Sequence, residues 1–155
     1  MIGRRALVVL PSALALLALA GCEAAPTGPV ALTLTVHAEP SQNPDPMGHG
    51  TPVAVRLYQL TDTLRFDQTD MYSLVTHEQE VLGSDLLGSE EFVVAPGTTR
   101  TLNRELAAGT RFLGVAVLFR DVEHADWRVA APVSGSTDLT LTISGLEAKL
   151  SAGSS

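Results

Sequence analysis

Apolar and polar residues alternate in several short stretches of this chain, which is the pattern of half-buried β-strands. The clearest stretches are residues 30–38, 52–60 and 138–144. In each, every second residue is apolar, so one face of the strand is expected to pack on a core. The residues predicted to point inward are Val30, Leu32, Leu34, Val36, Val53, Val55, Leu57, Leu139, Leu141 and Ile143.

Other stretches extend this pattern. Residues 110–120 form the most apolar run, which predicts a central strand partly buried on both faces. Residues 127–133 predict another strand. Residues 91–95 and 99–106 flank Pro96-Gly97, a turn signal that predicts a hairpin between them.

The period changes to that of a helix between residues 61 and 88. Met71, Leu74, Val75, Glu78 and Leu82 recur at helical spacing, and Gly83 is placed to end the helix. Either Asp67 or Thr69 is expected to cap its start, and residues 84–87 are expected to add one more helical turn. The sequence therefore predicts a small helical insertion at about residues 66–88.

About seven short strands, separated by turn signals and interrupted by one small insertion, predict an all-β fold, a two-sheet β-sandwich. The sandwich is expected to span residues 30–146, with residues 147–155 as a tail. Between the first two strands, residues 39–51 contain three prolines, two glycines and no apolar pattern, and they predict a long loop.

The first residues predict an export signal. Arg4 and Arg5 precede a run of about fifteen mostly apolar residues, which is too short to span a bilayer as a helix. The run ends in Leu-Ala-Gly before Cys22, a sequence that resembles a bacterial lipobox. We expect residues 1–21 to be a lipoprotein signal peptide, Cys22 to be lipid-modified, and residues 22–29 to be an acylated tether. The alternative is an ordinary cleaved signal that happens to end at a cysteine. Since the residue after Cys22 is Glu23 rather than Asp, outer-membrane sorting is expected.

Charge and residue types exclude several functions. The chain has 155 residues and a formal net charge of −7, with Lys149 as its only lysine. Nucleic-acid binding needs clustered Lys and Arg, so it is not expected. A single cysteine excludes an internal disulfide, and the four histidines show no metal-ligand spacing. The carboxylate pairs Glu90-Glu91 and Glu78-x-Glu80 are expected to be solvated, so we predict no enzyme activity, no metal and no cofactor.

Several segments, in order, are similar to those of one known family. Residues 52–60 (PVAVRLYQL) are similar to its second strand. Phe66, Asp70 and Leu74, followed by residues 82–86 (LGSDL), look like its helical insertion. Pro96-Gly97 and residues 112–121 with Trp127-Arg128 are similar to its later strands. Together these segments, which cover most of residues 30–145, resemble the TssJ lipoproteins of bacterial type VI secretion.

This resemblance implies a transthyretin-like β-sandwich anchored at the periplasmic face of the outer membrane. It implies a partner, the periplasmic C-terminal domain of a TssM-like inner-membrane protein, and it implicates the long loop in that contact. The candidate contact residues in this chain are Gln42, Asn43, Asp45, Met47 and His49. Two alternatives remain open: a periplasmic carrier of a small apolar ligand between the sheets, and a pilot lipoprotein for an outer-membrane pore subunit. No small-molecule substrate is expected.

Overall fold

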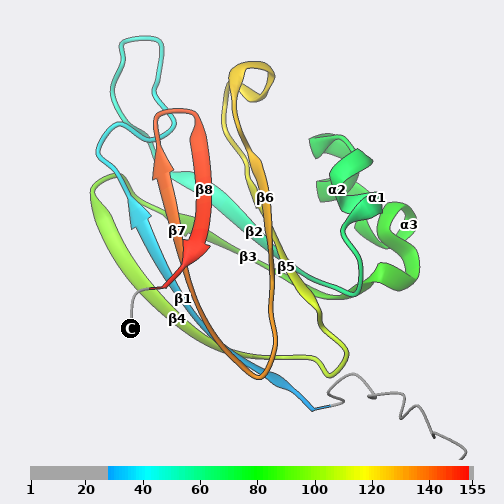
Figure 1. Ribbon diagram of the computed structural model, residues 1–155. Helices are drawn as coiled ribbons and strands as arrows, with labels where there is room; N and C mark the ends of the chain where they lie inside the picture. Colours follow the sequence, from blue (N-terminus) through cyan, green and yellow to red (C-terminus); the bar gives the residue numbers. More distant parts are fainter. Residues whose placement is uncertain (1–27, 154–155) are drawn as a thin grey trace, which may run out of the picture.

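The computed structural model describes residues 28–153, and it shows two four-stranded sheets packed face to face (Figure 1). The first sheet has the order β4-β1-β7-β8, with β1 antiparallel to β4 and parallel to β7. The second sheet has the order β3-β2-β5-β6 and is antiparallel throughout. The all-β sandwich with a small helical insertion, predicted from the alternating pattern, is confirmed.

The elements of the first sheet are β1 (Val30–Ala38), β4 (Thr98–Leu106), β7 (Ser136–Ser144) and β8 (Glu147–Ala152). Those of the second are β2 (Val53–Leu60), β3 (Leu86–Val94), β5 (Phe112–Val117) and β6 (Arg128–Pro132). Between β2 and β3 lie α1 (Leu64–Gln68), α2 (Met71–Thr76), α3 (Glu78–Leu82) and the 3-10 turn η1 (Gly83–Asp85), and a second 3-10 turn, η2 (Val122–His124), lies between β5 and β6.

The residues that the alternation predicted to point inward all lie in the core between the sheets. All ten are buried, each at 5% relative exposure or less. Burying a side chain such as Leu or Val contributes about 1.5–3 kcal/mol, so these rows provide much of the driving force for packing the sheets. The central position of β5 between β2 and β6, with both faces largely covered, is also as predicted.

The helical insertion forms a second, smaller core on the outer face of β2 (Figure 1). Tyr58, Phe66, Leu74 and Leu82 are fully buried there. Gly114 on β5 allows this packing, because a Cβ at that position would lie 2.9 Å from Leu60 Cδ1 and 3.0 Å from Phe66 Cζ. The insertion thereby buries the face of β2 opposite the main core.

The helices themselves differ from the prediction. The helical pattern over residues 71–82 is divided into α2 and α3 at His77, whose backbone leaves helical geometry (φ −132°, ψ 34°). Asp70, rather than Asp67 or Thr69, caps α2 by accepting a hydrogen bond from the Ser73 N–H (2.9 Å). Gly83 ends α3 with a positive φ of 54°, as predicted. The helical segment runs over residues 64–85, because from Leu86 onward the backbone pairs with β2.

Two other expectations were wrong, one because it depends on contacts distant in sequence and one because the strand pattern is weak. Pro96-Gly97 does form a turn, but it connects β3 of one sheet to β4 of the other, so the flanking strands are not a hairpin. The expected tail over residues 147–155 includes β8, which pairs with β7. Its alternation is weak, since only Ala148 is buried, and this explains why the pattern did not reveal it.

Candidate functional site

The long loop between β1 and β2, residues 39–52, projects from one end of the sandwich (Figure 1). We call this end, where β1 finishes and β2 begins, the distal end. The turn between β3 and β4, the segment between β5 and β6, and the turn between β7 and β8 lie at the same end, as the strand registers require.

Gln42 holds the base of this loop against the sheets. Its side chain is fully buried, and its Nε2 donates hydrogen bonds to the carbonyl oxygens of Val94 (3.0 Å) and Thr51 (3.2 Å). The Thr51 N–H donates in turn to the Gln42 carbonyl oxygen (3.0 Å). A buried amide that bonds to strand β3 and to the returning arm of the loop fixes the direction in which the loop leaves the sandwich.

Asn43 connects the loop to two neighbouring segments. Its Nδ2 donates to Thr51 Oγ1 (2.9 Å) and the Pro52 carbonyl oxygen (3.1 Å), and its Oδ1 accepts from the Arg120 N–H (2.8 Å). Its own backbone N–H donates to the Gly145 carbonyl oxygen (2.7 Å). Asn43 has a φ of +46°, a left-handed conformation that Asn tolerates better than most residues.

The tip of the loop, residues 45–49, is closed by Asp45. Its Oδ1 accepts hydrogen bonds from the backbone N–H groups of Met47 (2.8 Å) and His49 (2.9 Å), and its own N–H donates to the His49 carbonyl oxygen (2.8 Å). The pKa of Asp45 lies below its usual value, chiefly because the His49 N–H stabilises the charged carboxylate. His49 Nδ1 also lies 3.5 Å from Asp45 Oδ2.

Met47 is the most prominent side chain of this tip, with 80% of its surface exposed. The five loop residues singled out from the sequence therefore divide into two groups. Asp45, Met47 and His49 form the tip, whereas Gln42 and Asn43 are buried and make the contacts that hold it. The sequence carried a local signal for the tip, Asp45-Pro46 ahead of a glycine. No local pattern distinguished the two buried amides, because their burial depends on Val94 of β3 and on Arg120, which are distant in sequence.

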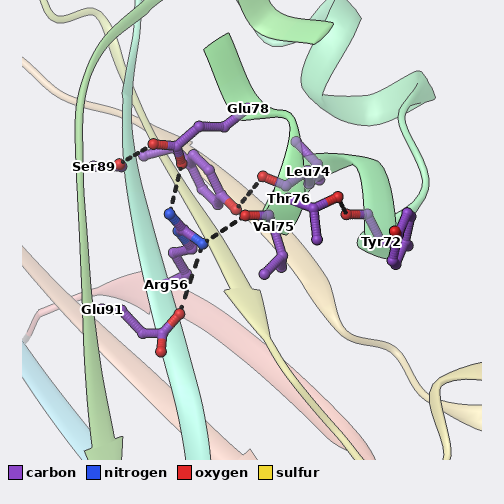
Figure 2. Close-up of polar contacts among 9 residues, drawn as sticks. Arg56, Tyr72, Leu74, Val75, Thr76, Glu78, Ser89 and Glu91 are labelled. Atoms are coloured by element: carbon purple, nitrogen blue, oxygen red, sulfur yellow. Dashed lines mark hydrogen bonds and ion pairs between the residues drawn. The ribbon is translucent and has the colours of Figure 1, made fainter. Parts of the chain in front are cut away.

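Of the predicted carboxylate pairs, Glu78, Glu90 and Glu91 form ion pairs, whereas Glu80 is exposed. Figure 2 shows Arg56 reaching from β2 to Glu78 of α3 (3.0 Å) and Glu91 of β3 (3.7 Å). The other Glu78 oxygen accepts from Ser89 Oγ (2.8 Å). Glu90 pairs separately with Arg104 (2.9 Å). These carboxylates join the insertion to the sheet and one sheet to the other.

Residues 28–153 contain no group of three His, Asp or Glu side chains placed to hold a metal ion. Within the same part of the chain, no helix is long and apolar enough to cross a membrane. The expected lipidation site, Cys22, and the signal peptide lie outside the described residues.

Three solved structures resemble this fold closely. The type VI secretion lipoprotein TssJ1 from Pseudomonas aeruginosa is 32% identical, with a TM-score of 0.78 over 82% of this chain and 98% of that one. A structure described as the type VI secretion protein TssM C-terminal domain from EAEC matches at 30% identity and a TM-score of 0.68, over 77% and 99% of the two chains. Lip from Serratia marcescens, a membrane-bound component of the system, matches at 20% identity and a TM-score of 0.73, over 78% and 96%, which shows the fold alone.

A comparison with curated protein sequences found no match. The model of one protein family, T6SS-SciN, the type VI secretion lipoproteins VasD, EvfM and TssJ, matches residues 30–147. This range covers nearly the whole sandwich and well over half of the chain. The chain therefore belongs to the type VI secretion lipoprotein family.

Proposed function

We propose that this lipoprotein is the docking subunit of the secretion system at the periplasmic face of the outer membrane. In this proposal Cys22 carries the lipid, and the loop tip binds the periplasmic C-terminal domain of a TssM-like inner-membrane protein. A chain similar to this one occurs in a structure described as the TssM C-terminal domain, which supports the choice of partner. The family, a structural secretion lipoprotein, supports a binding role over catalysis.

The position of the loop relative to the start of β1 carries this proposal. Val30 begins β1, and the loop follows its last residue, Ala38, so the two lie at opposite ends of the same strand (Figure 1). A nine-residue strand spans about 26 Å at a rise of about 3.3 Å per residue. Because Cys22 precedes Val30 in the chain, a lipid on Cys22 would be joined to the sandwich at the Val30 end. The tip would then point away from the outer membrane, toward a partner anchored in the inner membrane.

The braced geometry of the loop also favours binding. Gln42 and Asn43 hold its base, and Asp45 closes its tip, so little conformational entropy remains to be lost when a partner binds. Met47 offers an exposed and adaptable apolar contact, while His49 and Asp45 offer polar contacts beside it.

The carrier alternative gains no support from the space between the sheets. A pocket that reaches into it, beside Leu57, Leu106 and Leu113, has a volume of only about 20 Å³, close to what one water molecule needs. A larger pocket, of about 590 Å³, opens at the Val30 end and is lined mainly by turns and strand ends. Apart from Val30, the predicted inward residues do not line it.

The test is a titration of the periplasmic domain of the cognate TssM-like protein with soluble mature chain, in which Cys22→Ser prevents acylation. Met47→Asp should weaken binding by about tenfold or more, because it places a charge in an apolar contact. Val93→Asp is the matched control and should bind like the parent chain. Val93 is an exposed apolar residue (60%), but it lies on the edge strand β3 and not in the loop tip. Replacing only residues 45–49 with Gly and Ser should have the same effect as Met47→Asp while leaving Gln42 and Asn43 in place.

Thermal unfolding of each variant checks that the sandwich is intact. Unchanged affinity of both tip variants would remove the loop from the contact. Loss of binding by Val93→Asp with no effect of Met47→Asp would transfer the interface to the β3 edge.

A further inference from the structure

A second apolar surface lies beside the distal end, between α2 and the segment that connects β5 to β6. It is a groove of about 300 Å³ with almost entirely apolar walls. Its lining residues are Met71, Tyr72, Val75, Thr76, Leu118 and Val122. Tyr72 stands at its edge with 70% of its surface exposed. We call this surface the α2 groove.

Polar contacts from the sheet hold α2 in place, and Figure 2 shows the contact that Arg56 makes with Val75. Arg56 Nη1 donates to the Val75 carbonyl oxygen (2.9 Å), and the Tyr58 hydroxyl donates to the Leu74 carbonyl oxygen (3.2 Å). The carbonyl groups at the end of a helix lack partners within the helix, so these bonds satisfy them and attach α2 to β2. The wall of the groove is therefore formed before any partner arrives, which lowers the ordering cost of binding.

The α2 groove is structurally continuous with the loop of the proposed function. Leu118 and Val122, which line the groove, flank Arg120 in the same segment. The Arg120 N–H donates to Asn43 Oδ1 (2.8 Å), the residue that braces the loop. One segment thus contacts the loop on one side and forms a wall of the groove on the other.

A stable interface needs more surface area than the loop tip provides. A standard interface buries roughly 800 Å² on each partner, contributed by about 20–30 residues. The tip, residues 45–49, is far too small to supply this. An apolar surface that shares a wall with the braced loop is the natural extension of the contact, because apolar and aromatic residues such as Tyr72 carry most of the energy in the centre of an interface.

Charges around the α2 groove specify what it would accept. Asp121 and Glu123 flank Val122, and Asp70 precedes Met71. All three carboxylates are exposed. The positive groups beside the groove are Arg120, in the same segment as Asp121, and Arg128, whose Nη1 donates to the Thr69 carbonyl oxygen next to Asp70. Arg56, which bonds to the Val75 carbonyl oxygen, is itself paired with Glu78 and Glu91. His124 contacts Asp121 (2.9 Å). An apolar groove with a mainly acidic rim is complementary to an apolar side chain that has Arg or Lys on either side of it.

We propose that the α2 groove is the second half of the docking surface, and that it binds an apolar side chain from an Arg- or Lys-flanked segment of the same partner domain. This proposal rests on the proposed function, since it assigns a further contact to the same complex. It extends the interface from the loop tip across the β5–β6 segment to the helical insertion.

Titration of the partner's periplasmic domain with soluble mature chain tests the proposal. Tyr72→Ala should weaken binding by about fivefold or more, as truncation of a central aromatic contact does. Leu64→Ala is the matched control, because Leu64 is a similarly exposed apolar residue (61%) of the same insertion that does not line the groove. If the partner segment is basic, lowering the salt concentration should raise the affinity of the parent chain. Glu123→Lys should slow association and reverse this gain in affinity.

The outcomes separate the two proposals. If the parent chain binds and Met47→Asp weakens binding while Tyr72→Ala does not, the groove proposal is refuted and the docking function stands. If Leu64→Ala weakens binding as much as Tyr72→Ala, the effect belongs to the whole insertion and the groove is likewise overturned. If Glu123→Lys leaves affinity and its salt dependence unchanged, the basic segment is overturned. If the parent chain does not bind the domain at all, the proposed function falls, and the groove proposal falls with it.

Discussion

Replacing Asn43 with Ala should destabilise the distal end more than any exposed substitution in the loop. The change removes three side-chain hydrogen bonds, to Thr51, Pro52 and Arg120. At about 1 kcal/mol net for each bond, this amounts to about 3 kcal/mol. The backbone φ of +46° adds about 1 kcal/mol for Ala, which tolerates the left-handed region less well than Asn. We therefore expect a loss of about 4 kcal/mol if the loop and the sandwich unfold together.

Urea and thermal unfolding, followed by circular dichroism, measure this loss. For a domain of this size the midpoint temperature should fall by about 10–15 °C. Asn43→Gly is the informative control, because Gly loses the same hydrogen bonds but accepts a positive φ, so it should recover about 1 kcal/mol relative to Ala. Hydrogen exchange at the Met47 and His49 amides shows whether the loop opens by itself.

Two results would refute the reasoning. One is a melting temperature for Asn43→Ala within about 2 °C of the parent together with unchanged protection of the tip amides, which would mean that these bonds contribute nothing. The other is equal stability of the Ala and Gly variants, which would remove the backbone term. A small global effect with rapid exchange of the tip amides would instead place the lost energy in local opening of the loop.

Three further predictions concern the anchor, the core and alkaline stability. Cys22→Ser should abolish fatty-acid labelling and release a folded protein from the membrane fraction; continued membrane association would place the anchor elsewhere. Leu57→Asp or Val115→Asp buries an unpaired charge and should cost several kcal/mol, about 3 or more, whereas Leu64→Asp on the exposed surface should melt like the parent. Burial raises the pKa of Tyr58 to about 12 from its ordinary value of 10.0, so its contribution to stability is complete below pH 10 and is lost as the pH rises to 12. Tyr58→Phe should therefore make urea-unfolding free energies less pH-dependent between pH 10 and 12, and an unchanged slope would contradict this.

The strand faces could be predicted from the sequence because alternation is a local property. Leu32 and Val55 point inward because every second side chain of a half-buried strand faces the core. A register slip of one residue would turn the whole apolar row to solvent. Gly83 ended its helix as predicted, since a left-handed residue at a helix end needs only its own backbone freedom. These signals were sufficient for the fold class and for the helical insertion between two strands.

Contacts between distant segments decided the rest. Pro96-Gly97 marks a turn whether the flanking strands form a hairpin or belong to different sheets. Only the pairing of β3 with β2 and of β4 with β1 shows that the chain changes sheets there. Gln42 and Asn43 look like ordinary polar loop residues, because polarity reports what a side chain can bond to and not where its partner lies. Val94 of β3, the returning arm of the loop (Thr51 and Pro52) and Arg120 of the β5–β6 segment supply those partners. Gln42 and Asn43 are therefore buried supports of a tip formed by residues 45–49. Local sequence thus determined which segments are strands and which way they face, and tertiary packing determined which loop residues remain free to meet a partner.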